Sequence, residues 1–283
     1  MWAHVALCPG GTVSSVRFHR ISGAGHDLFT ALHVPAEGFV QAPILMCGGI
    51  GRSGADAEPL LRSLAALFAR GGRPALRFDL SCSGESGGQC EEASVSRWLA
   101  DVGAADAALR AACAAPRSAW FGVAAGANLM LAAARHYLPA PLLLVLLEPF
   151  ANGVDDDLED TMPLALEASP AGSGMRGRGL YRLRPDMVDI GGFPMSQALR
   201  ADLREVGMRV LPALPDAPVL LLSARMEAID DLPPGLPAAA RARLQVVRID
   251  ERPGQPTQVP VAHRYAPRML VSVIESHIRG AHE

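Results

Sequence analysis

The fold of this chain is decided by the stretch Ala119-Trp120-Phe121-Gly122-Val123-Ala124-Ala125-Gly126-Ala127-Asn128-Leu129-Met130. It begins as a short apolar strand, passes through a glycine-pinched turn, and continues as an Ala/Leu-rich helix that we expect to end near Tyr137. Small residues around the turn allow a strained backbone and let the helix pack close to the strand. The frame Gly122-x-Ala124-x-Gly126 is that of a nucleophile elbow, which presents one side chain above a parallel sheet. Ala124 holds the position where a Ser or Cys nucleophile belongs.

Apolar runs of strand length alternate with helical segments on both sides of this stretch. An edge hairpin is expected from two alternating runs at 15–19 and 28–34. Strands are further expected at 43–47, 74–80, 118–121, 142–147, 218–222 and 245–249, and helices at 58–70, 95–114, 237–244 and 266–278. The alternation predicts an α/β fold with a mostly parallel central sheet, helices on both faces and right-handed crossovers.

The alternation breaks between residues 151 and 211. A segment of about 60 residues is too long for an ordinary connection. We therefore predict a helical lid at 151–211, inserted into a core formed by 1–150 and 212–283. Within the lid, Gly191 to Ser196 is expected to precede a helix that runs to Val206.

Composition limits the class of protein. Of the 283 residues, 49% are hydrophobic and 19% are charged, which is enough apolar content for a sizeable core. The net charge of −3 gives no electrostatic basis for binding nucleic acid or an anionic membrane. The longest apolar run, 142–147, is too short to span a bilayer. All 26 basic residues are Arg, which indicates GC-rich coding and a bacterial source.

The cysteines indicate a reducing compartment. The chain has 5 cysteines, an odd number, and none of them shows CxxC spacing. We expect reduced thiols in a cytoplasmic protein, with no disulfide framework and no zinc site. The run Gly48-Gly49-Ile50-Gly51 lacks the dinucleotide pattern, and the sequence has no P-loop. No cofactor or metal is therefore expected.

Catalytic side chains are expected outside the carboxyl ends of the strands, where open α/β sheets bind ligands. Three such positions follow the chain order nucleophile, acid, histidine. After Ala124, Glu227 follows the strand at 218–222 and is expected to orient the histidine. His263, between the last strand and the last helix, is the expected general base. Asp230 and Glu148 remain alternative acids.

Backbone groups beside Ala124 are candidates for an oxyanion hole. The N–H groups of Gly49 and Ala125 are the expected donors, because glycine permits close approach and Ala125 directly follows the elbow position. Ile50, Phe193 and Met195 are the expected substrate contacts. The apolar side chains of the lid predict an apolar or amphipathic acyl group. Arginines at 176–184 have two interpretations, contact with an anionic carrier or a solvated face.

The chain resembles α/β-hydrolases, in particular the serine-aminopeptidase-like branch with a helical cap. The segment from Arg77 to Gly87 is similar to that branch's "RFDxRGxGxSxG" stretch but has Ser81-Cys82 where Arg-Gly is usual. Trp120 to Asn128 and Gly191 to Ser196 resemble hydrolases associated with exosortase systems, some of which carry Cys in a "GLCxGA" elbow. The resemblance covers residues from about 16 to 278. It implies ester, thioester, amide or lactone chemistry through an acyl-enzyme, with Ala124, Glu227 and His263 in the three triad positions.

Ala124 has two explanations. In the first, Ala replaces a Ser or Cys in an enzyme that hydrolyses or transfers acyl groups of a small-molecule substrate, free or carrier-bound, so that this chain is catalytically impaired. In the second, Ala124 is native, and the protein acts without covalent catalysis as a lyase, cyclase or isomerase, or as a binding module.

Overall fold

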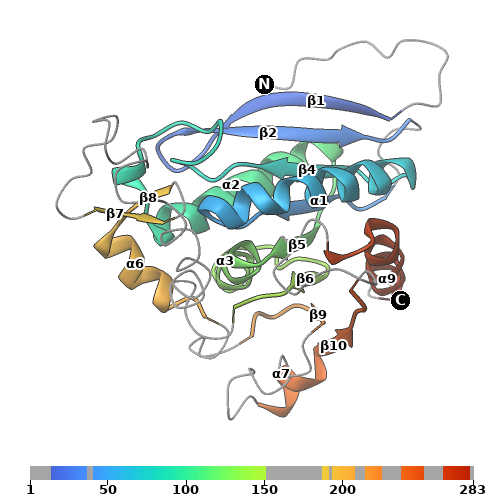
Figure 1. The fold of residues 1–283 in the computed structure, drawn as a ribbon. Helices are drawn as coiled ribbons and strands as arrows, with labels where there is room; N and C mark the ends of the chain where they lie inside the picture. Colours follow the sequence, from blue (N-terminus) through green and yellow to red (C-terminus); the bar gives the residue numbers. More distant parts are fainter. Residues whose placement is uncertain are drawn as a thin grey trace.

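One mixed β-sheet organises the residues that the computed structural model describes, namely 14–36, 41–150, 187–190, 193–207, 214–224, 237–251 and 264–280. Within these ranges the sheet has eight strands in the order β1-β2-β4-β3-β5-β6-β9-β10 (Figure 1). They are β1 (Ser15–Ser22), β2 (Asp27–Val34), β3 (Ile44–Cys47), β4 (Ala75–Phe78), β5 (Ala119–Val123), β6 (Leu144–Leu147), β9 (Val219–Ser223) and β10 (Leu244–Arg248).

The strand directions match the prediction from the sequence. β1 pairs antiparallel with β2, and β2 pairs antiparallel with β4. All the following neighbours, from β4 through to β10, pair in parallel. The predicted α/β fold with a mostly parallel sheet and an antiparallel N-terminal edge is confirmed. The parallel strands β3, β5 and β6 are fully buried, as expected for strands covered on both faces.

Helices cover both faces of the sheet (Figure 1). α2 (Val95–Cys113) and α3 (Ala125–Ala133) pack in one core, and α1 (Gly51–Arg70) and α9 (Pro267–Gly280) pack in the other. Successive side chains of a strand enter opposite cores: Leu45 lies with α2 and α3, whereas Ile44 and Met46 lie with α1 and α9. Shorter elements are η1 (Cys90–Glu92), before α2, and α7 (Ala238–Ala242), between β9 and β10.

Two helix boundaries differ from the prediction. α1 begins at Gly51 instead of near Glu58, so the expected glycine-rich loop is shorter, and Pro59 lies inside the helix. α3 ends at Ala133 instead of near Tyr137. Glycine and proline lower helix propensity by about 1 and 3 kcal/mol per residue, and tertiary packing overrides such local preferences. Among the helices in the described ranges, none has the length and apolar content needed to cross a bilayer.

The described residues within the predicted insertion form two strands where the sequence had predicted only helix and its cap. β7 (Met187–Ile190) pairs antiparallel with β8 (Phe193–Ser196), and α6 (Gln197–Arg204) follows directly. The expected helix is therefore present, but the residues before it are extended. Ser196 caps α6, because its Oγ accepts a hydrogen bond of 3.1 Å from the Leu199 N–H. Most of the predicted lid lies outside the described residues, and its limits at 151 and 211 remain a prediction.

Candidate active site

Ala124 occupies the sharp turn between β5 and α3. Its φ of 51° and ψ of −128° are rare for a residue that has a side chain. Its N–H donates to the Leu147 carbonyl oxygen at 2.9 Å, and its own carbonyl oxygen accepts from the Ala127 N–H at 2.9 Å. Ala124 is buried, with 5% of its surface exposed. Hydrogen bonds to β6 and within α3 therefore hold a conformation that an unconstrained alanine avoids.

The two glycines that flank Ala124 are required by close backbone packing. A Cβ on Gly122 would lie 2.5 Å from the Cα of Ala127 in the first turn of α3. A Cβ on Gly126 would overlap the Gly48 carbonyl oxygen and lie 2.6 Å from the Cys47 carbonyl oxygen. These contacts explain the glycine frame: the helix starts so close to β5 and to the end of β3 that no side chain fits.

The candidate oxyanion donors belong to these two touching segments. Ala125 is the first residue of α3, where backbone N–H groups have no acceptor within the helix. Gly49 follows Gly48, whose carbonyl group packs against Gly126. The structure thus brings the end of β3 and the start of α3 together. Whether the two N–H groups share an oxyanion stays a prediction.

Cys47 is the thiol at the end of β3, beside the turn. Its Sγ lies 3.4 Å from the Gly48 carbonyl oxygen. Burial, with contributions from Asp101 and Asp79, raises the pKa of this thiol to about 12. Because the thiolate is the nucleophilic form, Cys47 is a poor substitute for the side chain that Ala124 lacks.

Glu148, the first residue after β6, joins three segments. Its carboxylate accepts hydrogen bonds from Ser223 Oγ at 2.8 Å, from the Ala224 N–H at 2.9 Å and from the Tyr265 hydroxyl. Its φ is 48°, so strained backbone occurs at the ends of both β5 and β6. These three donors make Glu148 a structural clamp between β6, β9 and the segment before α9.

Tyr265 anchors the segment that leads into α9. Its side chain is fully buried and belongs to the same hydrophobic cluster as Ala124. Burial and the neighbouring Glu148 carboxylate raise the pKa of Tyr265 above its usual range, so the phenol stays protonated and donates its hydrogen bond. Tyr265, two residues after position 263, is therefore fixed to Glu148, the residue that follows β6.

The predicted site residues are described to different extents. Glu227, the alternative acid Asp230 and His263 lie outside the described residues, so their triad roles remain predictions. Ile50 is 2% exposed and Met195 is fully buried, and both pack in the core on the α2 and α3 side. Phe193 begins β8, and its side chain lies outside the described part. Substrate contacts by these three residues also stay predictions.

Asn128 is a site residue that the sequence analysis missed. Its Nδ2 donates to the carbonyl oxygens of Phe150 and Val206, each at 2.9 Å, and its Oδ1 accepts from the Phe150 N–H at 2.8 Å. Phe150 directly precedes the predicted lid, and Val206 lies near its other end. The signal in the sequence was an amide in an otherwise apolar helix, because a buried amide needs partners.

Comparisons with known proteins agree with this architecture. No protein-family model and no curated protein matches the sequence. Among solved structures, Est1E from Butyrivibrio proteoclasticus with ferulic acid bound has a TM-score of 0.59 at 17% identity, covering 93% of this chain and 98% of that one. A hydrolase from Agrobacterium vitis S4 has a TM-score of 0.55 at 19% identity, with coverages of 94% and 99%.

A third similar structure, epoxide hydrolase A from Mycobacterium thermoresistibile, has a TM-score of 0.53 at 14% identity and covers 94% of this chain and 99% of its own. Identities this low establish the architecture and leave the reaction open, because one fold serves many chemistries. Strand order, strand directions and these similarities together lead to one conclusion: this chain has the α/β-hydrolase fold.

Proposed function

We propose that this chain has the site of an enzyme that hydrolyses or transfers the acyl group of an ester, thioester or lactone, with Ala124 in the place of its Ser or Cys nucleophile. The strained backbone of Ala124 carries the proposal. Such a conformation costs about 1 to 3 kcal/mol at a residue with a side chain. In a nucleophile elbow this strained geometry is functional, because it presents the nucleophile above the sheet.

The remaining triad positions are assigned to His263 as general base and Glu227 as the acid that orients it. The anchoring of Tyr265 supports the first assignment. Tyr265, two residues further along the chain, is held at Glu148, and β6 before Glu148 pairs with β5, the strand that leads to Ala124. Because three donors already engage the Glu148 carboxylate, the proposal takes the acid from the residues that follow β9 in the sequence, which include Glu227 and the alternative Asp230.

In the complete site, His263 takes the proton of the nucleophile as it attacks the acyl carbon, and later gives that proton to the leaving group. The N–H groups of Gly49 and Ala125 stabilise the negative charge that develops on the carbonyl oxygen. Water or a second acceptor then releases the acyl group. A chain with Ala124 lacks the attacking atom, and loss of a triad nucleophile lowers kcat by roughly 10⁶-fold. We therefore propose that the chain is catalytically impaired.

The substrate is proposed to be a small acyl compound, free or attached to a carrier. Ile50, Phe193 and Met195 are its proposed apolar contacts. The hydrogen bonds from Asn128 to Phe150 and Val206 support this, because they hold residues near both ends of the proposed insertion on α3, the helix that begins at Ala125.

The test restores the nucleophile. Ala124→Ser and Ala124→Cys are assayed with activated esters and thioesters of short and medium acyl chains. We expect turnover at least about 100-fold above the parent, since oxyanion and binding contributions remain when a nucleophile is lost. Adding His263→Ala to either variant should remove the gain.

The matched control is Ala132→Ser, which places a hydroxyl on the same helix away from the turn. It should leave activity at the level of the parent. If both Ala124 variants fold and neither exceeds this control, the acyl-transfer proposal is wrong.

A second function is favoured by Ala124 itself, if alanine is the native residue. The protein would then act by elimination, cyclisation or isomerisation with His263 as a non-covalent base, or would serve as a binding module. The chain as it stands would be active or would bind a ligand tightly. His263→Ala would abolish the activity in the first case and leave binding in the second.

A further inference from the structure

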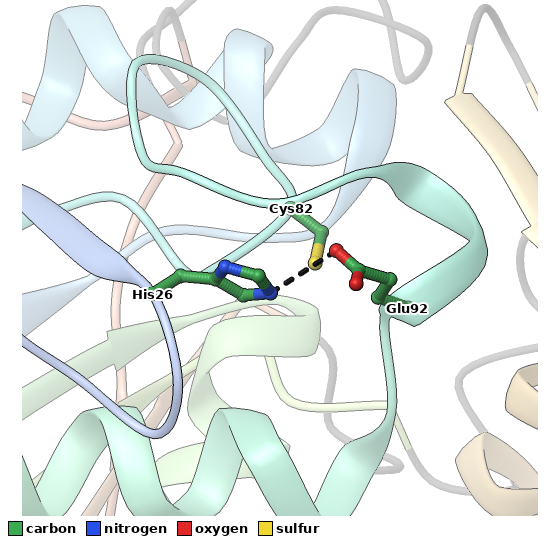
Figure 2. Close-up of side chains that lie close together, drawn as sticks. All are labelled: His26, Cys82 and Glu92. Carbon is green, nitrogen blue, oxygen red and sulfur yellow. Dashed lines mark ion pairs between the residues drawn. The ribbon is translucent and has the colours of Figure 1, made fainter.

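His26, Cys82 and Glu92 form a cluster of metal-ligating side chains outside the candidate active site (Figure 2). One ligand atom from each residue lies within 4.8 Å of the other two. The residues come from three segments: the turn between β1 and β2, the loop after β4, and η1. The spacing of the cysteines predicted no zinc site, because the three ligands are scattered over the sequence and only the fold brings them together.

The backbone around the cluster favours the approach of the thiol to the imidazole. Cys82 has a φ of 63°, a conformation that suits glycine better than cysteine. Gly88 lies against both groups, because a Cβ there would be 2.6 Å from Cys82 Sγ and 2.9 Å from His26 Nε2. A cysteine at a strained position and a glycine opposite it together keep Sγ close to Nε2.

The polar groups of Arg97, His26 and Glu92 converge at the cluster, and Glu92 Oε2 also accepts a hydrogen bond from the Gln89 N–H at 2.9 Å. Arg97 Nη1 lies 2.6 Å from His26 Nε2; because a guanidinium only donates, this contact is a hydrogen bond in the tautomer whose Nε2 carries no proton. Glu92 Oε2 lies 3.1 Å from the same Nε2. Two acceptor atoms this close repel each other unless a cation stands beside them. In the structure the Arg97 guanidinium supplies that charge.

We propose that this cluster is a binding site for one divalent transition-metal cation of the zinc type, which exchanges with the Arg97 guanidinium. Zinc prefers thiolate, imidazole and carboxylate ligands at about 2.0 to 2.3 Å in a tetrahedron, which places neighbouring ligand atoms about 3.3 to 3.7 Å apart. The 3.1 Å between Nε2 and Oε2 is close to this spacing. Three protein ligands leave the fourth position for water.

The exposure of the ligands provides an entry path. The side chains of Glu92 and His26 are 45% and 21% exposed, whereas Cys82 is 4% exposed. A cation would enter from the carboxylate side and reach the buried sulfur last, while the half-buried Arg97 turns its head group toward solvent.

The bound ion would fasten the loop after β4 to the β1–β2 turn. This loop follows the strand paired with β3, whose end lies beside Ala124. η1 also packs beside β8 of the insertion. The proposed role is therefore to stabilise the edge of the candidate active site, and it does not depend on the reaction proposed there.

The test titrates chelator-treated protein with Co²⁺, whose absorption reports thiolate ligation and tetrahedral geometry, followed by competition with Zn²⁺. We expect one equivalent per chain and a thiolate-to-cobalt charge-transfer band. Cys82→Gly removes the ligand and relieves the positive φ, so this variant should fold. Loss of a residue that only hydrogen-bonds a metal ligand costs about 10- to 100-fold in metal affinity. Cys82→Gly and His26→Ala remove the ligands themselves, so each should weaken Co²⁺ binding at least about 100-fold.

Control variants locate the site. Cys113→Ala removes a buried thiol outside the cluster and should leave affinity and spectrum unchanged. Arg97→Gln removes the competing charge and should tighten binding about tenfold. The proposal is overturned if the parent shows no charge-transfer band, if the band survives in Cys82→Gly, or if Arg97→Gln binds Co²⁺ no more tightly than the parent.

Discussion

Gly126 is the residue at which the turn tolerates least change. The atoms that a Cβ would meet, the carbonyl oxygens of Gly48 and Cys47, belong to the backbone and have no rotamer into which they can retreat. We predict that Gly126→Ala lowers the free energy of unfolding by more than about 3 kcal/mol, within the range of severe packing defects. Urea unfolding followed by circular dichroism measures the loss.

Gly280 is the matched control, because a Cβ there has no heavy atom within 4 Å. Gly280→Ala should change the free energy of unfolding by no more than about 0.5 kcal/mol. Equal effects of the two substitutions would contradict the close approach of α3 to β3.

At the scale of elements, Asn128 fixes α3 to Phe150, just before the predicted insertion, and to Val206, near its other end. Asn128→Ala leaves the Phe150 N–H and the carbonyl groups of Phe150 and Val206 without their partner. The bond to Val206 is buried and the two bonds to Phe150 are part-buried. An unsatisfied buried group costs about 1 to 3 kcal/mol, and the part-buried groups add less, so we predict a total loss of about 3 kcal/mol. Relative to the parent, Asn128→Ala should speed up hydrogen exchange more at the Phe150 amide than in the centre of β5.

Gln41 offers the control for this substitution. Its exposed amide donates to the Gly71 carbonyl oxygen at 2.8 Å. Gln41→Ala should cost less than about 1 kcal/mol, because water replaces an exposed hydrogen bond. A similar loss in both variants would mean that Asn128 does not hold the insertion in place.

At the scale of the whole molecule, Arg73 and Glu275 join two segments that lie 202 residues apart in the sequence. The guanidinium bonds both carboxylate oxygens, Nε to Oε1 at 2.8 Å and Nη2 to Oε2 at 2.9 Å, and Arg73 also donates to the Ala42 carbonyl oxygen. The pair links the turn before β4 to α9, and both side chains are largely buried.

Removing one partner of this pair leaves a buried charge alone. We predict that Glu275→Ala lowers the free energy of unfolding by about 3 to 5 kcal/mol. Asp216→Ala, which breaks the exposed pair with Arg243, should cost at most about 1 kcal/mol. Thermal and urea unfolding of the two variants measure the contrast, and a loss of less than 1 kcal/mol for Glu275→Ala would show that α9 is held by its apolar face alone.

Much of the fold was predictable because its signals are local. Continuous apolar runs such as Leu142 to Leu147, bounded by turn residues, identify buried parallel strands, and helical spacing in α9 identifies a one-sided helix. The glycine frame around Ala124 located the strand-to-helix turn. The glycines at the start of α1 predict a later beginning for this helix than the structure has. The sequence also gives no strong strand signal for β7 and β8, and in both places packing outweighs the weak local propensity.

The sequence by itself determined the strand–helix order, the antiparallel edge and the place of Ala124 in the turn after β5, because these depend on contacts between near neighbours along the chain. Only the tertiary structure decided which distant groups meet: Asn128 with Val206, Tyr265 with Glu148, and His26 with Cys82 and Glu92. Such pairings have no local signature, since they exist only after the sheet has brought loops from separate strands to one edge.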